Sequence, residues 1–262
     1  MNTRSLIRRV GHYKQELAQK ILFGGEQVLS ICHIRAVAHE IGYRYRVRRW
    51  PPWLTVLGFL TQTLEQDQSC RNAVAKIWAW LSVLGGELVN TDTGPYCDAR
   101  KRLPEALLSR LSAGKGADLE AQVQGRDRWQ CELDFRSIKA VMKMDVLRCK
   151  TPAMVRKEIT VHLLGYNVIR GLMYEAASRT SQVARRLSFK GTLQALNSFW
   201  PLMIVLPHGM RHRLYELLLI FVGREKLPFR PNRIEPRKIK RRPKSYPLLN
   251  VPRHEARRRE KT

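Results

Sequence analysis

Apolar residues recur three and four positions apart along most of the chain, which is the period of a helix that buries one face. No series of alternating apolar and polar residues predicts a sheet. The pattern therefore predicts a mainly α fold. The strongest helical segments are Val28 to Ile41, Leu54 to Leu64, Ala73 to Leu84, Trp129 to Met144, Met154 to Ala177 and Tyr215 to Val222.

Proline and glycine indicate two further helix starts. Thr93-Gly94-Pro95 opens a segment that continues through Arg102, and Pro104 lies at the first turn of another helix, which reaches Leu111. Two short helices joined across Leu103 could form a helix-turn-helix, although sequence specifies that motif only weakly.

Composition divides the chain into four stretches. Residues 1–112 and 126–223 are helical in pattern, whereas 113–125 combines glycines with small and polar residues, which is typical of a linker or a junction. The tail, 224–262, holds 15 basic and 4 acidic residues. Its six prolines disfavour helix and predict extended, solvated chain.

The overall charge points to a polyanionic partner. The chain has 48 Lys and Arg against 22 Asp and Glu, a formal net charge of +26. Nucleic acid is the first candidate, because such an excess repels itself unless a polyanion screens it. The apolar runs are too short to span a bilayer, and the N-terminus lacks a secretory signal pattern, so we expect a cytoplasmic protein without a membrane segment.

The five cysteines are widely spaced, with no CxxC pair and no histidine at zinc-finger spacing. We interpret them as reduced core residues of a cytosolic protein.

The segment Tyr43 to Trp50 interleaves arginines with aromatic residues. It predicts phosphate contacts combined with stacking or groove packing, and its alternative is a solvated linker whose aromatic rings pack into the core. Two tail arginines are further candidates, unless the tail is a basic extension without a dedicated target. The candidate DNA-binding residues are Arg44, Arg46, Arg48, Arg49, Arg241 and Arg242.

A charged strip is expected on the helix that begins near Trp129. At about 100° per residue, Arg128, Glu132 and Lys139 fall within about 40° of one another, with apolar residues on both sides of the arc. Such a strip can face a pocket. The alternative is a solvated face on which Glu132 pairs with Arg128 and Arg136 at four-residue spacing.

The same residues carry a family resemblance. Arg128, Glu132 and Lys139, spaced by three and six residues, resemble the signature around the catalytic glutamate of the insertion-sequence-four family of bacterial transposases. The similarity includes Met144 to Pro152, Met154 to Glu158 and His162 to Arg170. It also includes Ser69 to Val74, Asp92 to Pro104 and Arg237 to Pro247.

The resemblance implies a ribonuclease H-like fold in which two aspartates and one glutamate hold two divalent ions, normally Mg²⁺, for strand cleavage and transfer. Glu132 would be the catalytic and metal-binding glutamate, and Arg128 and Lys139 would contact the DNA backbone beside it. The implied partners are double-stranded DNA and the inverted-repeat ends of a transposon, with self-association or pairing with an intact transposase. A nucleoid location follows.

Two departures from the family pattern matter. Gly125 stands where the signature begins with tyrosine, and only 113–125 occupies the interval in which the family carries its two catalytic aspartates on strands. Asp118 is the single aspartate there. An internal deletion explains both departures, and one carboxylate cannot build a two-metal site, so we expect no strand cleavage and no productive Mg²⁺ binding.

The resulting expectation is an N-terminal helical DNA-binding region, 1–112, which recognises transposon ends, followed by a junction at 113–125. Residues 126–223 would be the helical remnant of a ribonuclease H-like catalytic domain with most strands missing, and 224–262 a basic tail. The alternative is a non-enzymatic DNA-binding regulator or inhibitor of an intact transposase.

Overall fold

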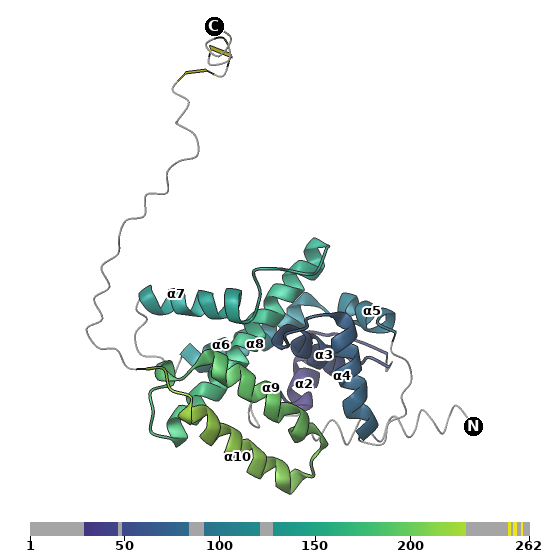
Figure 1. The fold of residues 1–262 in the computed structure, drawn as a ribbon. Helices are drawn as coiled ribbons and strands as arrows, with labels where there is room; N and C mark the ends of the chain where they lie inside the picture. The colour runs from purple at the N-terminus through teal and green to yellow at the C-terminus, as the bar shows by residue number, and fades with distance from the viewer. Residues whose placement is uncertain are drawn as a thin grey trace. The chain divides into compact units, whose positions relative to one another are not determined.

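The computed structural model describes residues 29–46, 49–83, 92–120, 128–228, 251–252, 254–255 and 258. In these ranges the regular elements are helices, and the only β pairing is one isolated antiparallel bridge between Leu187 and Lys226. The expected mainly α class is confirmed (Figure 1). None of the described helices is long and apolar enough to cross a membrane.

The helices follow the predicted segments closely. Before residue 121 they are α2 (Ile31–Glu40), α3 (Pro52–Leu64), α4 (Cys70–Val83), α5 (Gly94–Arg102) and α6 (Glu105–Glu120). After residue 127 they are α7 (Arg128–Arg136), the π-helix η1 (Ser137–Val141), α8 (Pro152–Arg179), the 3₁₀-helix η2 (Ala184–Arg186), α9 (Phe189–Val205) and α10 (His208–Arg224). Helix α9 was not among the predicted segments, because Pro201 lies inside it and proline normally ends a helix.

Helix α6 extends further than its sequence indicates. Leu107, Leu108 and Leu111 are fully buried, and the helix packs along α8. It then continues to Glu120, into the segment that the glycines marked as a linker. Gly114 has open space around its Cα, so its cost to the helix is limited to its poor helix propensity, about 1 kcal/mol relative to alanine.

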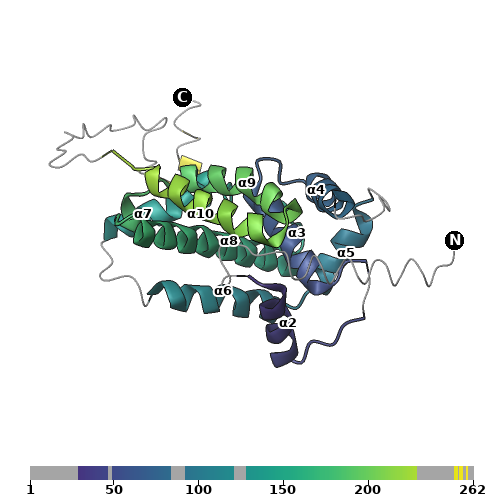
Figure 2. The same ribbon diagram turned by 90° about the horizontal axis from the view of Figure 1, so that it is seen from below.

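Helix α8 is the centre of the fold. It contacts α3, α6, α9 and α10, and Figure 2 shows it running the length of the helical body among them. A close approach occurs at Gly165, where a Cβ atom would lie 3.0 Å from Leu64 of α3 and 3.2 Å from the methyl of Met142. The described parts of 1–112 and 126–223 therefore share one hydrophobic core.

The tail forms a second unit, which begins at Pro228. Its described residues include a short helical piece at His254 and Glu255, where the amide of Glu255 donates to the carbonyl of Pro252 over 3.0 Å. The expectation of extended chain fails at this point, since the last proline precedes the turn and leaves its amides unobstructed. Arg241 and Arg242 lie outside the described residues.

Candidate nucleic-acid interface

The basic and aromatic segment leaves α2 at a sharp turn. Gly42 has a φ of 67°, and its amide donates to the carbonyl of His39. The amide of Tyr43 then donates to the carbonyl of Ala38 over 2.8 Å. This left-handed glycine ends the helix and redirects the chain across the surface.

A pocket of about 340 Å³ lies where this segment meets α3 and the end of α5. Trp50 is 5% exposed, and its ring lies 4.8 Å from that of Tyr96 and 6.0 Å from that of Trp78. A Cβ atom on Gly58 would lie 3.1 Å from Tyr96 and 3.2 Å from Trp50, so a larger residue would have to displace these rings by a few tenths of an ångström. The residues lining the pocket are Tyr43, Arg44, Tyr45, Arg46, Trp50, Pro52, Thr55, Ala99, Arg102 and Leu103.

The polar lining of this pocket is cationic. Arg44, Arg46 and Arg102 are exposed, and no Asp or Glu is among the lining residues. The hydroxyl of Tyr43 donates to the carbonyl of Arg102 over 3.2 Å, which ties the segment to the end of α5. Burial raises the pKa of Tyr43, so its hydroxyl stays protonated at neutral pH. The pocket can therefore attract an anionic group beside aromatic rings.

The structure brings together two of the four arginines predicted in this segment. Arg49 is exposed but does not line the pocket, and Arg48 lies outside the described residues. Arg102 was missed by the sequence analysis. The sequence feature that could have indicated it is the run of basic residues in the last turn of α5. That run does not show which of its side chains faces outward.

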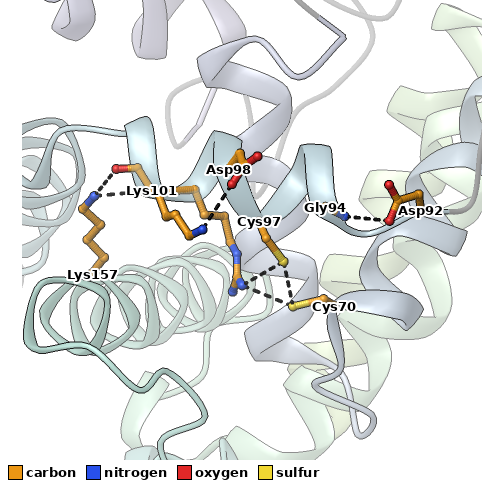
Figure 3. Close-up of polar contacts among 8 residues, drawn as sticks. Cys70, Asp92, Gly94, Cys97, Asp98, Lys101 and Lys157 are labelled. Carbon is orange, nitrogen blue, oxygen red and sulfur yellow. Dashed lines mark hydrogen bonds and ion pairs between the residues drawn. The ribbon is translucent and has the colours of Figure 1, made fainter.

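The neighbouring Arg100 is buried, and its guanidinium makes contacts inside the protein. Its guanidinium lies 4.9 Å from the ring centres of Phe59 and Tyr96, and it donates to Gln62 Oε1 over 3.1 Å. Lys157 of α8 donates to the backbone carbonyls of Arg100 and Lys101 (Figure 3), so a cation closes the C-terminal end of α5. Burial lowers the pKa of Lys157.

The cysteines are free, but the description of all five as core residues is wrong. Cys32 and Cys131 are exposed, because they lie on the outward faces of α2 and α7. Cys70 and Cys97 are half-buried with their sulfurs 3.8 Å apart (Figure 3). Burial raises the pKa of Cys70, so its thiol stays protonated at neutral pH.

The candidate catalytic residues lie on α7 and η1. Glu132 on α7 and Lys139 on η1 are both exposed, and the side chain of Arg128 lies outside the described residues. The helix changes type at Ser137, whose carbonyl accepts from the amide of Met142 five residues later. Regular 100° indexing therefore holds only as far as Arg136, and the expectation that Arg128, Glu132 and Lys139 share a face stays a prediction.

The apolar residues beside the expected strip differ in exposure. Ile138 and Met142 are buried, whereas Leu133 is 41% exposed and Phe135 is 62% exposed. The outer side of α7 therefore presents large apolar side chains beside Glu132.

Asp134 attaches α7 to the rest of the body. Its Oδ1 accepts hydrogen bonds of 2.6 Å from Arg170 of α8 and from Arg185 of η2. Burial raises the pKa of this carboxyl, but the hydrogen bond from Arg185 and the charges of both arginines outweigh burial and lower it overall. Arg170 also lies 5.3 Å from the ring centres of Tyr166 and Phe189. This part of the family-like sequence thus positions α7.

Glu158 fixes the loop between η1 and α8. Its buried carboxylate accepts from the amide of Arg148 over 3.0 Å and from the amide of Cys149 over 2.9 Å. Burial and, to a smaller extent, this carboxylate raise the pKa of Cys149 to about 12.

The carboxylates described do not fit a two-metal site. No group of three or more His, Cys, Asp or Glu side chains in the described part of the chain could hold a metal ion. Asp134 is occupied by two guanidinium groups, and Asp118 lies on α6, where its side chain is not among those described. Glu132 therefore has no described set of partner carboxylates.

Comparison with known proteins identifies a transposase relative. The chain is 31% identical over 166 residues to transposase InsG for insertion sequence element IS4 of Escherichia coli (strain K12). The match covers 61% of this chain and 35% of the relative, so the chain matches about a third of the relative's length. No family model and no solved structure matches. The chain is thus related to an IS4 transposase over part of its length.

Proposed function

We propose that this protein is a DNA-binding derivative of an IS4-type transposase that lacks the parts needed for strand cleavage. The observation that carries the proposal is the relationship itself: 166 residues of this chain are 31% identical to a transposase and cover 35% of its length. A transposase that has lost internal sequence retains its DNA contacts wherever the residues that make them survive.

Double-stranded DNA is the proposed partner because of how charge is distributed. The chain has a formal net charge of +26, and Arg44, Arg46 and Arg102 converge on one surface pocket without an acidic neighbour in its lining. Each cation that meets a phosphate releases counterions, which makes binding strong and dependent on salt. We assign recognition of the inverted-repeat ends to 1–112 and sequence-independent contacts to the tail, including Arg241 and Arg242.

Catalytic inactivity is the second part of the proposal. Glu132 corresponds by resemblance to the family's catalytic glutamate, and Arg128 and Lys139 would support it at the DNA backbone. Two-metal cleavage requires further carboxylates, because the two ions must hold both the attacking and the leaving oxygen. We propose that the aspartates were lost at the 113–125 junction, together with the strands of a ribonuclease H-like domain, so that Mg²⁺ is not bound productively.

The full chain tests both parts in one experiment. Binding is measured by fluorescence anisotropy with duplexes that carry the element's inverted repeats and with shuffled duplexes, over a series of salt concentrations. Nicking is then assayed with and without Mg²⁺. We expect tight, salt-sensitive binding and no nicking. Absence of binding at low salt would refute the proposed function, and Mg²⁺-dependent nicking would refute the inactivity.

A second candidate function is regulation of an intact transposase by direct pairing. The observation that favours it is the outer side of α7, where Leu133 and Phe135 are exposed beside Glu132. Helix α7 resembles the family's catalytic helix, and its exposed apolar side chains could be buried by a protein partner. Size-exclusion chromatography of the two proteins mixed tests this, with the Leu133→Ser/Phe135→Ser variant expected to abolish co-elution.

A further inference from the structure

We propose that the pocket between the Tyr43–Arg46 segment, α3 and α5 holds a single unpaired nucleotide of the bound DNA. This inference rests on the proposed DNA binding and adds the form of DNA that the site prefers. Its basis is the combination of a nucleotide-sized hollow, aromatic walls and three arginines in one lining.

The size of the pocket and the exposure of its rings favour one nucleotide over an intact base pair. Its volume of about 340 Å³ lies in the lower part of the usual range for small-molecule sites, about 300 to 1,000 Å³. Trp50 in the lining is 5% exposed because it packs against Tyr96 and Trp78, so Tyr45, which is 37% exposed, offers the accessible ring. A base that stays stacked in a duplex has no free face for this ring, whereas an unpaired base can leave the stack and enter the pocket.

The aromatic lining provides a stacking surface. The rings of Tyr43 and Tyr45 lie 5.6 Å apart at 38°, and Tyr45 is 37% exposed, so its ring is accessible to an incoming base. Tyr43 is held in place by its hydrogen bond to the carbonyl of Arg102. Stacking on tyrosine tolerates any base, because every base has a π face.

The arginines supply the contact to the phosphate. Arg44, Arg46 and Arg102 are exposed and come from two segments that flank the pocket. Guanidinium groups match phosphate oxygens in geometry as well as in charge. An apolar ligand would leave these cations without a partner, and the carboxylates of an acidic peptide would not stack on the tyrosine rings. A nucleotide uses both.

The experiment compares a short blunt duplex with the same duplex carrying one unpaired 2-aminopurine, using the full chain. We expect about tenfold tighter binding of the second duplex and quenching of the 2-aminopurine fluorescence, since stacking on an aromatic side chain contributes substantially per base. Tyr45→Ala should remove both effects, whereas Tyr45→Phe should keep them. Phe221→Ala on α10, a matched loss of an exposed ring, should change neither.

The outcomes separate this inference from the proposed function. Equal affinity for both duplexes overturns the nucleotide pocket while leaving DNA binding intact. A preference for the unpaired base that survives in a folded Tyr45→Ala variant also overturns it. Failure to bind either duplex refutes the proposed function and this inference together.

Discussion

Helices α7 and α8 both lie in the stretch that resembles the transposase signature, yet the body holds them in different ways. On α8, the charged residues Lys157, Glu158 and Arg170 are buried and occupied by backbone or side-chain partners. On α7, Glu132, Leu133 and Phe135 are exposed, and Asp134 provides the attachment to α8. A family motif can thus contain residues of two kinds: some stabilise the fold, and others remain exposed on its surface.

The same division separates the arginines of the N-terminal region. Arg100 is 7% exposed and stacked between aromatic rings, whereas Arg44 and Arg102 are exposed at the pocket. Substitutions of the first kind should change the stability of the protein, and those of the second kind should change its interactions.

The largest effect is expected from breaking the attachment of α7. Arg170→Met leaves Asp134 in a half-buried site with one guanidinium instead of two. We expect the free energy of unfolding to fall by about 2 kcal/mol, less than the loss for a fully buried pair, because Asp134 is half-buried and keeps Arg185. Urea denaturation followed by circular dichroism measures it.

The matched control for Arg170 is a surface arginine on the same helix. Arg179 pairs with Glu175 and Glu216 but is 45% exposed in its side chain. Arg179→Met should cost less than about 1 kcal/mol, as is usual for exposed pairs. Equal losses of stability in the two variants would show that the ion pair between Arg170 and Asp134 is no stronger than a surface salt bridge.

A smaller effect, dependent on pH, is expected from the interior of α8. His162 is 1% exposed, and neither ring nitrogen has a hydrogen-bond partner. Burial lowers its pKa, although the charge of Glu158 opposes this. Below about pH 6.5 the unfolded chain takes up a proton that the folded protein does not, so stability is complete above that pH and falls as the pH is lowered.

The measurement is urea denaturation between pH 7.5 and pH 5.5, above the range in which carboxylates titrate. We expect a loss of about 1 kcal/mol per pH unit at most. His162→Leu should flatten this dependence, whereas His212→Asn, a change at an exposed histidine, should not. A dependence that is identical in all three proteins would exclude His162 as its cause.

The helices were predictable from sequence because apolar spacing reports directly on a buried face, as it does for α3 and α8. The end of α6 was not, since packing of Leu107 to Leu111 on α8 carries the helix past Gly114 despite its poor propensity. The π-helix at Ser137 was also unpredictable from the pattern. A single extra residue per turn changes which side chains share a face, and an index of 100° per residue cannot show it.

The candidate site was predictable in part. Interleaved arginines and aromatics identified Arg44 and Arg46, but Arg102 lies far along the chain and joins them only through the tertiary fold. Sequence also could not show that Arg100, two positions before Arg102, points into the core. On a helix these two positions lie about 200° apart, so the side that is buried depends on the neighbouring helices.

Arg44 and Arg46 are exposed charges at the pocket. Arg44→Ala/Arg46→Ala should weaken binding to duplex DNA and reduce the salt slope by about 2, since each phosphate contact contributes about 0.9. Stability should be unchanged, because both side chains are exposed. Arg213→Ala, an exposed arginine on α10, is the control. An unchanged slope in the double variant would show that these arginines do not contact phosphate.

The smallest effect, a change in DNA affinity, is expected at Glu132, whose carboxylate is exposed on α7. In an intact relative, removal of the corresponding glutamate should abolish turnover because one of two metals loses its ligand. If this chain lacks the partner aspartates, Glu132 is an exposed anion close to Arg136, and its loss removes a repulsion toward phosphate. Screening at physiological salt limits the gain in DNA affinity to about twofold.

Glu132→Ala and Glu132→Gln should therefore behave alike, with nicking at background in Mg²⁺ and DNA affinity equal to or slightly above that of the unmodified protein. Anisotropy titrations and a supercoiled-plasmid nicking assay measure the two quantities. A functioning site would give a different result: the unmodified protein would nick DNA in Mg²⁺, and both substitutions would eliminate the activity. That result would place the outer side of α7 in a working active site and would require two carboxylates from parts of the chain outside the described residues.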